Sequence, residues 1–563
     1  MAGILISISK YLLVILMAVY TYSCFSVFRR KNEEDQKDIY ARQNAIMFFL
    51  HFLCYAIIII HTNNTEIILF YLYQVVFLVS TLLLFRVIYP GTSRLITNNM
   101  CLLISIGFIM ISRLTYEKSQ KQFMIAAVSM VIALIIPVFI RRLKCYKKLT
   151  YVYAVLGIGG LLAVAVLGRT SYGAKLAFRV GGISIQPSEF IKIIFVFYVA
   201  SMLHRDRSLR QIIKTTVVAA VHVLILVGSK DLGSALIFFV IYLSMLYAAT
   251  KNPIYIGAGA ISGSVAALAA YAIFRHVRTR VIAWKDPLSV AQDEGYQIVQ
   301  SLFAIGTGGW FGMGLYQGSP LKIPVVEEDF IFSAICEEFG VLFGLCLILI
   351  CVSCFVMFFN IAMSLRDSFY KLIALGLGCG YGFQVFLTIG GVTKFIPLTG
   401  VTLPMVSYGG SSLLSTLISF SVIQGLYMIR NDEEERRGNR KPGNSGKKRK
   451  RRKPDAEQMG AGTGKAGTGR AEGGQGQTAA GQPGTWSGQT AAGQPGTRSG
   501  QTAAGQPRPR SGQTAAGQYR TRQEESDAAA RPYQAVSRNP GIWKMGAASG
   551  GNRKGSGGKT GRS

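Results

Sequence analysis

The chain of 563 residues is half hydrophobic and only 16% charged, and it carries a formal net charge of +32 with a mean hydropathy of +0.34. This composition excludes an ordinary soluble globular protein. A basic balance often indicates nucleic-acid binding, but here the basic residues gather in short loops between apolar runs and in the C-terminal tail. Membrane topology explains that distribution better, so we expect no nucleic-acid partner.

Apolar runs of about 20 residues, the length of a helix that crosses a bilayer core, recur from residue 8 to residue 428. They predict an all-α integral membrane protein, a polytopic helical bundle with about thirteen transmembrane helices. The predicted helices are 8–28, 43–61, 66–88, 98–114, 122–140, 150–168, 187–203, 212–229, 232–249, 254–274, 330–358, 368–390 and 404–428.

The chain divides into three parts. Residues 1–95 hold three of the predicted spans, residues 96–430 hold the other ten, and residues 431–563 form a basic tail rich in Gly, Gln and Ala. In the tail the sequence Gly-Gln-Thr-Ala-Ala-Gly-Gln recurs with a period of twelve residues. Such a composition buries too little apolar surface to offset the entropy of ordering, so it predicts disorder.

Loop charge predicts the orientation of the bundle. Three alternate loops are rich in Lys and Arg, namely 29–42, 141–148 and 205–214. By the positive-inside rule they share the cytoplasmic side, which places the N-terminus outside and the C-terminal tail in the cytoplasm. The outward-facing polar segments are then 168–188, 390–403 and the large segment 275–329. Because all three lie at one face of the bundle, we expect a site there.

The motif Gln186-Pro187-Ser188-Glu189 begins a predicted helix, and Lys192 follows within one turn. Pro187 and Ser188 suit a helix start, and Glu189 and Lys192 share a helical face. A capping carboxylate with a lysine that snorkels to the interface would explain the motif without function. Lys192 lies inside the apolar run, however, where a cation needs a partner or an aqueous cavity. We therefore favour a functional role.

A second motif, Lys230-Asp231-Leu232-Gly233-Ser234-Ala235, is a tight polar break between two predicted spans. Asp is a favourable N-cap residue. A helix-capping turn is thus at least as good an interpretation as a direct catalytic role.

Five carboxylates gather near the start of the span at 330–358, namely Glu327, Glu328, Asp329, Glu337 and Glu338. The helix dipole explains one acid at a helix start, but not five in so short a stretch. Helical geometry places Glu337 closer than Glu338 to the line of Asp329. We therefore expect Glu337 to share a site with Asp329, and Glu338 to meet a neighbouring helix.

Residues 396–412 contain two prolines, adjacent glycines and several hydroxyl side chains, Ser407 and Ser411 among them. They predict irregular backbone at membrane depth, which is tolerated only where it is buried in protein or lines a wet cavity. Its free N–H groups and hydroxyls are good donors to phosphate.

Together these patterns resemble the SEDS family, the relatives of FtsW, RodA and SpoVE, over about residues 98–428. The matching motifs are QPSE at 186–189, KDLGSA at 230–235, GYQ at 295–297 with the glycine-rich run after it, DFIF at 329–332 with the Glu-Glu pair beyond, and LPMVSYGGSS at 403–412. The family has ten spans, as does the predicted core. The first 95 residues are an extension outside that pattern.

The resemblance implies a peptidoglycan glycosyltransferase in the bacterial cell membrane. Such enzymes polymerise lipid II, the undecaprenyl-diphosphate-linked disaccharide pentapeptide, at the outer face of the membrane during division, elongation or sporulation. The expected partners are lipid II, a class B penicillin-binding protein that supplies the transpeptidase, and other divisome or elongasome membrane proteins.

The resemblance also implies roles for individual residues. Asp329 matches the essential aspartate of the family and is our candidate general base, and Glu189 and Lys192 match the polar pair of the QPSE helix. Cations or donors must stabilise the diphosphate as it leaves. The candidate substrate-binding residues are Gln186, Glu189, Lys192, Arg278, Arg280, Glu337, Ser407 and Ser411. A divalent cation, Mg or Mn, could assist, although the sequence shows no clear ligand set.

Two other functions remain open. A flippase that carries lipid II across the bilayer would use the same cavity and the same cations. Alternating access favours a site near the bilayer midplane, however, whereas these acids gather at the outer end. A non-catalytic activator of a penicillin-binding protein is the second alternative, and the presence of Asp329, Glu189 and Lys192 together argues against it.

Overall fold

The computed structural model describes residues 2–30, 32–142, 145–171, 174–180, 183–293 and 295–439. The predicted disorder of the repeat-containing tail falls on residues 440–563, which lie outside the described residues. Residues 431–439, which we assigned to the tail, continue the last helix instead.

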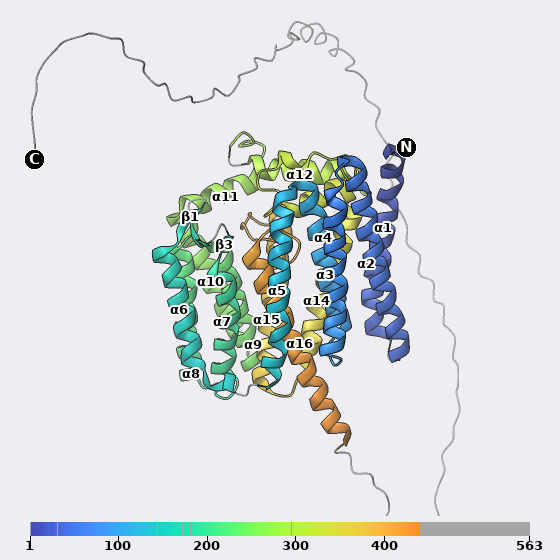
Figure 1. The fold of residues 1–563 in the computed structure, drawn as a ribbon. Coiled ribbons are helices and arrows are strands. Elements are labelled where there is room, and N and C mark those ends of the chain that lie inside the picture. The colour runs from blue at the N-terminus through green and yellow to red at the C-terminus, as the bar shows by residue number, and fades with distance from the viewer. Residues whose placement is uncertain are drawn as a thin grey trace, which may run out of the picture. The chain divides into compact units, whose positions relative to one another are not determined.

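The predicted helical bundle is confirmed, since each of the thirteen predicted spans corresponds to a long helix (Figure 1). Twelve are long and apolar enough to cross a membrane, and α7 is close to that length with 17 residues. The thirteen helices are α1 (Ala2–Ser26), α2 (Glu33–Thr62), α3 (Glu66–Ile88), α4 (Arg94–Leu114), α5 (Tyr116–Arg142), α6 (Thr150–Leu167), α7 (Pro187–Leu203), α8 (Leu209–Gly228), α9 (Leu232–Thr250), α10 (Ile254–Ile273), α14 (Val341–Ser364), α15 (Ser368–Val392) and α16 (Gly410–Asn439).

The all-α prediction missed a small antiparallel sheet in the segment between α6 and α7. Its strands, in the order β1-β2-β3, are β1 (Arg169–Ser171), β2 (Ala174–Val180) and β3 (Ile183–Ile185). Arg169 is paired with Ala177, and Phe178 with Ile185. Backbone polar groups near a membrane need internal partners, and hairpin pairing supplies them here.

The segment 275–329 is also more regular than a loop. It contains the helices α11 (Arg275–Lys285) and α12 (Tyr296–Gly308) and the short 3-10 helix η3 (Pro320–Lys322). In Figure 1, α11 and α12 lie across the same end of the bundle as β1 and β3. This end is where the outward-facing segments were predicted to converge.

The predicted span 330–358 is broken into α13 (Ile331–Phe339) and α14 by Gly340, whose φ is +91°. The cause is a backbone contact with the glycine-rich run. Val341 N donates to Gly309 O at 2.9 Å, and Leu342 N donates to Trp310 O at 3.2 Å. A β-carbon on Gly340 would collide with Trp310 O. The break therefore depends on a tertiary contact rather than on local helix propensity.

Helix α4 is the central helix of the bundle, because every residue of its apolar window is buried. The extension helices α2 and α3 pack against it, α1 reaches it through Tyr20, and α14 and α5 also contact it. Hydrogen bonds along one side of α4 join Asn99 to Tyr20 (3.1 Å), Asn98 to Gln43 (3.0 Å), Ser105 to His51 (2.8 Å) and Ser112 to Tyr55 (2.8 Å). The extension and the core thus share one interior.

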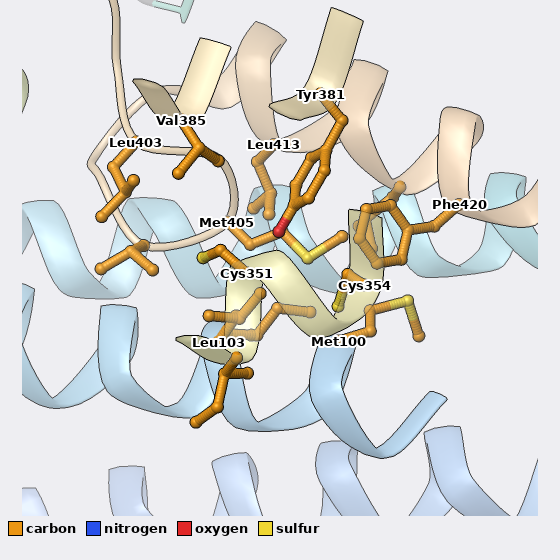
Figure 2. Close-up of a cluster of buried hydrophobic side chains, with 14 of the residues drawn as sticks. Met100, Leu103, Cys351, Cys354, Tyr381, Val385, Leu403, Met405, Leu413 and Phe420 are labelled. Atoms are coloured by element: carbon orange, nitrogen blue, oxygen red, sulfur yellow. The ribbon is translucent and has the colours of Figure 1, made fainter. Parts of the chain in front are cut away.

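On the other side of α4 lies a dense apolar cluster formed with α14, α15, α16 and the segment 403–405. Figure 2 shows Met100 and Leu103 of α4 beside Cys351 and Cys354 of α14, with Met405 above them. Gly107 allows the close approach, since a β-carbon there would lie 2.8 Å from the carbonyl oxygens of Met405 and Val406. Close packing of this kind fixes the position of the irregular segment that follows α15.

Candidate active site

Asp329 lies just before α13, at the end of the bundle that carries α11. A β-carbon added to Gly400 would lie 3.7 Å from Asp329 Oδ2 and 3.5 Å from Arg280 Nη2, so both charged groups border the same position. Arg280 is fixed there because its Nη1 donates to Thr399 O at 3.0 Å. The arrangement places a carboxylate and a guanidinium beside one exposed glycine.

The pKa of Asp329 is raised from 3.8 to about 6. Removal from water is the main cause, although the side chain keeps some solvent exposure, and the positive charge of Arg280 opposes the rise. The pKa of the preceding Glu328 is also raised, first by burial and then by the charge of Asp329. A carboxylate with a pKa near 6 is a better general base at neutral pH than an ordinary aspartate.

Arg280 and Arg278 have different environments. Arg280 faces the site, and Trp284 on the same helix donates from Nε1 to Lys394 O at 3.1 Å, which anchors α11 to the turn after α15. Arg278 is exposed, donates to Ala272 O at 2.9 Å and stacks near Tyr271. Of these two predicted cations, only Arg280 lies beside Asp329.

His276, one helical turn before Arg280, is a site residue that the sequence analysis missed. Burial lowers its pKa, with further contributions from the charges of Arg280 and Lys230, and its Nε2 is buried without a partner among the described residues. Thr399 Oγ1 is likewise buried without a described partner. Both groups can bind a polar substrate. Thr399 belongs to the segment 396–412 that the sequence analysis singled out, whereas the only sequence signal for His276 was its four-residue spacing from Arg280.

The turn with Asp231 joins the QPSE motif. Asp231 Oδ2 accepts from Ser188 Oγ at 3.2 Å and from Gln186 Nε2 at 3.4 Å, and Oδ1 caps α9 through Ser234 N at 3.1 Å. Burial raises the pKa of Asp231, and its charge interacts with that of Arg280. Asp231 is therefore a helix cap that also neighbours the site, and a direct catalytic role for it stays a prediction.

Glu189 and Lys192 form a nearly buried ion pair at 2.9 Å, with side-chain exposures of 10% and 12%. Lys192 Nζ also donates to Gln384 Oε1 at 2.7 Å, and Ser415 Oγ donates to Glu189 Oε2 at 2.9 Å. Gln384 Nε2 in turn donates to Thr402 O at 3.2 Å. The pair thus links α7, α15 and α16 to the irregular segment beside the site.

The donors of the segment 403–412 are largely used within the protein. Ser407 Oγ accepts from Leu403 N at 3.0 Å, and Ser411 Oγ accepts from Gln186 N at 2.9 Å. Tyr408 N donates to Glu327 O at 2.7 Å. These bonds fix the segment in place and leave fewer groups for phosphate than the sequence suggested.

Glu337 and Glu338 contact the stretch of chain that follows the glycine-rich run. Glu337 Oε1 accepts from Ser319 N at 2.8 Å, and its Oε2 is buried without a described partner. Glu338 accepts from Arg113 of α4 at 2.9 Å and from Tyr316 N at 3.2 Å. Glu337 therefore holds the chain around Ser319, whereas Asp329 borders Gly400.

A further ion pair, between Lys118 of α5 and Glu327, was not predicted. Glu327 is thereby bound through both its carboxylate and its carbonyl oxygen, which fixes the backbone just before Asp329. Among the described residues, no group of three or more His, Cys, Asp or Glu is placed to hold a metal ion.

The fold and the site define a polytopic membrane protein with a partly desolvated carboxylate beside a fixed cation. A family model described as "Cell cycle protein", that of FtsW, RodA and SpoVE, matches residues 92–432. The chain belongs to this family.

Several named proteins are similar to this chain in sequence. A protein named "Peptidoglycan glycosyltransferase RodA" from Mycobacterium tuberculosis is 33% identical over 366 residues, which cover 59% of this chain and 77% of the relative. The protein of that name from Mycobacterium leprae is 32% identical over 418 residues, covering 68% and 90%. "Probable peptidoglycan glycosyltransferase FtsW" from Bacillus subtilis is 31% identical over 287 residues, covering 48% and 71%.

A solved structure supports the same fold. A chain from "Structural coordination of polymerization and crosslinking by a peptidoglycan synthase complex" superposes with a TM-score of 0.51 and 22% identity. The match covers 60% of this chain and 98% of the other. It supports the fold of the ten-span core.

Proposed function

We propose that this chain is a peptidoglycan glycosyltransferase that polymerises lipid II, with Asp329 as the general base. The observation that carries the proposal is the pKa of Asp329, about 6, at a carboxylate beside Arg280. The family membership and the glycosyltransferase relatives support the reaction class.

The reaction is a glycosyl transfer. A sugar hydroxyl of the acceptor gives its proton to Asp329 as its oxygen attacks the anomeric carbon of the lipid-linked donor. The bond from that carbon to the diphosphate oxygen breaks, and the lipid diphosphate leaves with the bonding electrons. Arg280 stabilises the charge that develops on the diphosphate, because a fixed cation in a poorly solvated site needs no reorganisation.

The remaining predicted residues act in positioning. Gln186 joins Asp231 to Ser411, and the pair Glu189–Lys192 connects to Thr402 through Gln384. Through these bonds α7 holds the irregular segment, whose Thr399 O accepts from Arg280 of α11. We propose no step through a divalent cation, and EDTA added to the assay tests whether Mg or Mn assists.

The test is polymerisation of purified lipid II by wild type and Asp329→Asn, each with and without a class B penicillin-binding protein as the proposed partner. We expect glycan strands from wild type only. The partner must be shown to form no strands by itself. Strands from both variants would refute the assignment of Asp329.

If neither variant makes strands with the partner present, the flippase and the activator become the better hypotheses. Translocation of lipid II in liposomes tests the first, and stimulation of the partner's transpeptidation tests the second. The proposed orientation, with the N-terminus and the site outside and residue 439 in the cytoplasm, is tested by labelling single cysteines from each side of the membrane.

A further inference from the structure

A cavity of about 240 Å³ lies between α2, α3 and α4. It is located where α3 ends and α4 begins, at the end of the bundle opposite α11 and α12 (Figure 1). Its walls come from both the extension and the first helix of the core, and nothing in the proposed glycosyl transfer uses it.

Two arginines give the cavity a positive charge. Arg86 lies in the last turn of α3 and Arg94 in the first turn of α4. Among the described residues, neither arginine forms a hydrogen bond or an ion pair, and no acidic residue lines the cavity. Arg94 is also at a helix N-terminus, where the dipole favours an anion rather than a cation. Within the part of the chain that the structure describes, no carboxylate therefore pairs with either charge.

The rest of the wall is apolar, with a few polar groups. Phe48 of α2 and Leu82 and Leu83 of α3 line it, and Leu83 is exposed on the outer surface of the bundle. Tyr40 and Asn44 add polar groups, and Asn44 Oδ1 is buried with no described partner. An occupant must therefore combine an anion, an apolar chain and a hydroxyl that can donate to Asn44.

We propose that the cavity binds the headgroup of an anionic glycerophospholipid. The phosphate lies between Arg86 and Arg94, a glycerol hydroxyl donates to Asn44 Oδ1, and the acyl chains remain in the bilayer along Leu83. Basic pockets between transmembrane helices are suited to such headgroups. Because α2 and α3 belong to the extension and α4 to the core, the lipid joins these two parts of the protein.

The proposal is tested on the full chain, purified in detergent and stripped of lipid. Native mass spectrometry measures binding of phosphatidylglycerol, phosphatidylcholine and inorganic phosphate to wild type and to Arg86→Gln/Arg94→Gln. Each arginine near an anionic lipid contributes roughly fivefold in affinity, so the double variant should bind phosphatidylglycerol roughly thirtyfold more weakly. Phosphatidylglycerol should also raise the Tm of wild type but not that of the double variant.

The matched control is Arg205→Gln/Arg207→Gln, which removes two exposed charges from the loop between α7 and α8, at the same end of the bundle. It should bind phosphatidylglycerol as wild type does. A second variant, Leu82→Trp, fills the cavity and keeps both arginines, and it too should lose the lipid. Equal binding of phosphatidylcholine, equal binding by the arginine double variant, or displacement of the lipid by millimolar inorganic phosphate would each overturn the proposal.

Discussion

Arg280 and Asp329 border the same glycine, Gly400, yet no direct ion pair joins these two side chains. A direct pair would hold the pKa of the carboxyl low. The separation leaves the aspartate with a pKa of about 6 and leaves the guanidinium free to face a second anion. In the proposed mechanism, this one arrangement supplies both the base and the charge stabiliser.

Asp329→Asn should lower glycan polymerisation at least about a hundredfold, because an amide cannot accept the proton. Its fold should be kept. The pKa of Asp329 in the folded protein, about 6, is higher than its ordinary value of 3.8. Protonation of Asp329 therefore favours the folded state, and this contribution to stability is full below pH 3.8 and is lost as the pH rises through about 6. At pH 7 the variant should therefore unfold at the same temperature as wild type or higher. Asp293→Asn, at an exposed aspartate of the same segment, is the control and should keep full activity.

The rate of wild type should rise with pH and reach half its maximum near pH 6, where Asp329 loses its proton. Removal of the nearby cation in Arg280→Gln should move this midpoint to higher pH, since Arg280 lowers the pKa of Asp329. Arg278→Gln, which removes an exposed cation of the same helix, should leave the midpoint in place. A pH–rate profile of each variant measures the midpoints, and an unchanged midpoint in Arg280→Gln would contradict the proposed coupling.

Lys192→Met should destabilise the protein by about 3–5 kcal/mol, because it leaves the carboxylate of Glu189 buried without its cation. The double variant Lys192→Met/Glu189→Gln should recover much of this loss, since no unpaired charge remains. Thermal unfolding in detergent gives the comparison. If the double variant is as unstable as the single one, the pair does not act as a buried ion pair.

Gly340→Ala should destabilise the protein by more than about 1 kcal/mol, because a side chain at φ +91° is strained and its β-carbon meets Trp310 O. Gly306→Ala is the matched control. It lies in α12 with nothing within 4 Å of the added carbon, so the higher helix propensity of Ala should make it neutral or stabilising. Unfolding temperatures of both variants decide between these outcomes.

Deletion of residues 456–563 should leave the rate of polymerisation unchanged, because every proposed site residue precedes residue 412. The measurement is the specific activity of the purified truncated protein against that of the full chain. Loss of most of the activity in a well-folded truncation would show that the tail contributes to catalysis.

The sequence predicted the helical bundle well, because bilayer thickness fixes the length of an apolar span. It could not predict the break at Gly340, which arises from backbone contacts with residues 309–310. Nor could it predict which of Arg278 and Arg280 lies beside Asp329. The two side chains face different sides because residues 275–285 form a helix, in which residues two apart are rotated by about 200° around the helix axis.

The candidate site was predicted in part. The motif at Gln186 and the carboxylate at Asp329 were recognisable, but their distances to Asp231, His276 and Gly400 depend on helix packing. Strands β1 and β3 gave no clear signal, since three-residue strands carry little alternation. The seven residues of β2 do alternate, with Lys175 and Arg179 between apolar residues, and the sequence analysis missed this signal.

The hydrogen bonds between α4 and the extension limit how far this chain can be shortened. A fragment that begins at residue 96 would keep all ten spans of the family, yet Asn98 would lose Gln43 and Ser105 would lose His51. Asn99 and Ser112 would lose Tyr20 and Tyr55 but keep Ser353 and Ser119 as partners within the core. A chimaera that joins its core to another relative should therefore carry α1, α2 and α3 along, because α1 and α2 supply these lost partners.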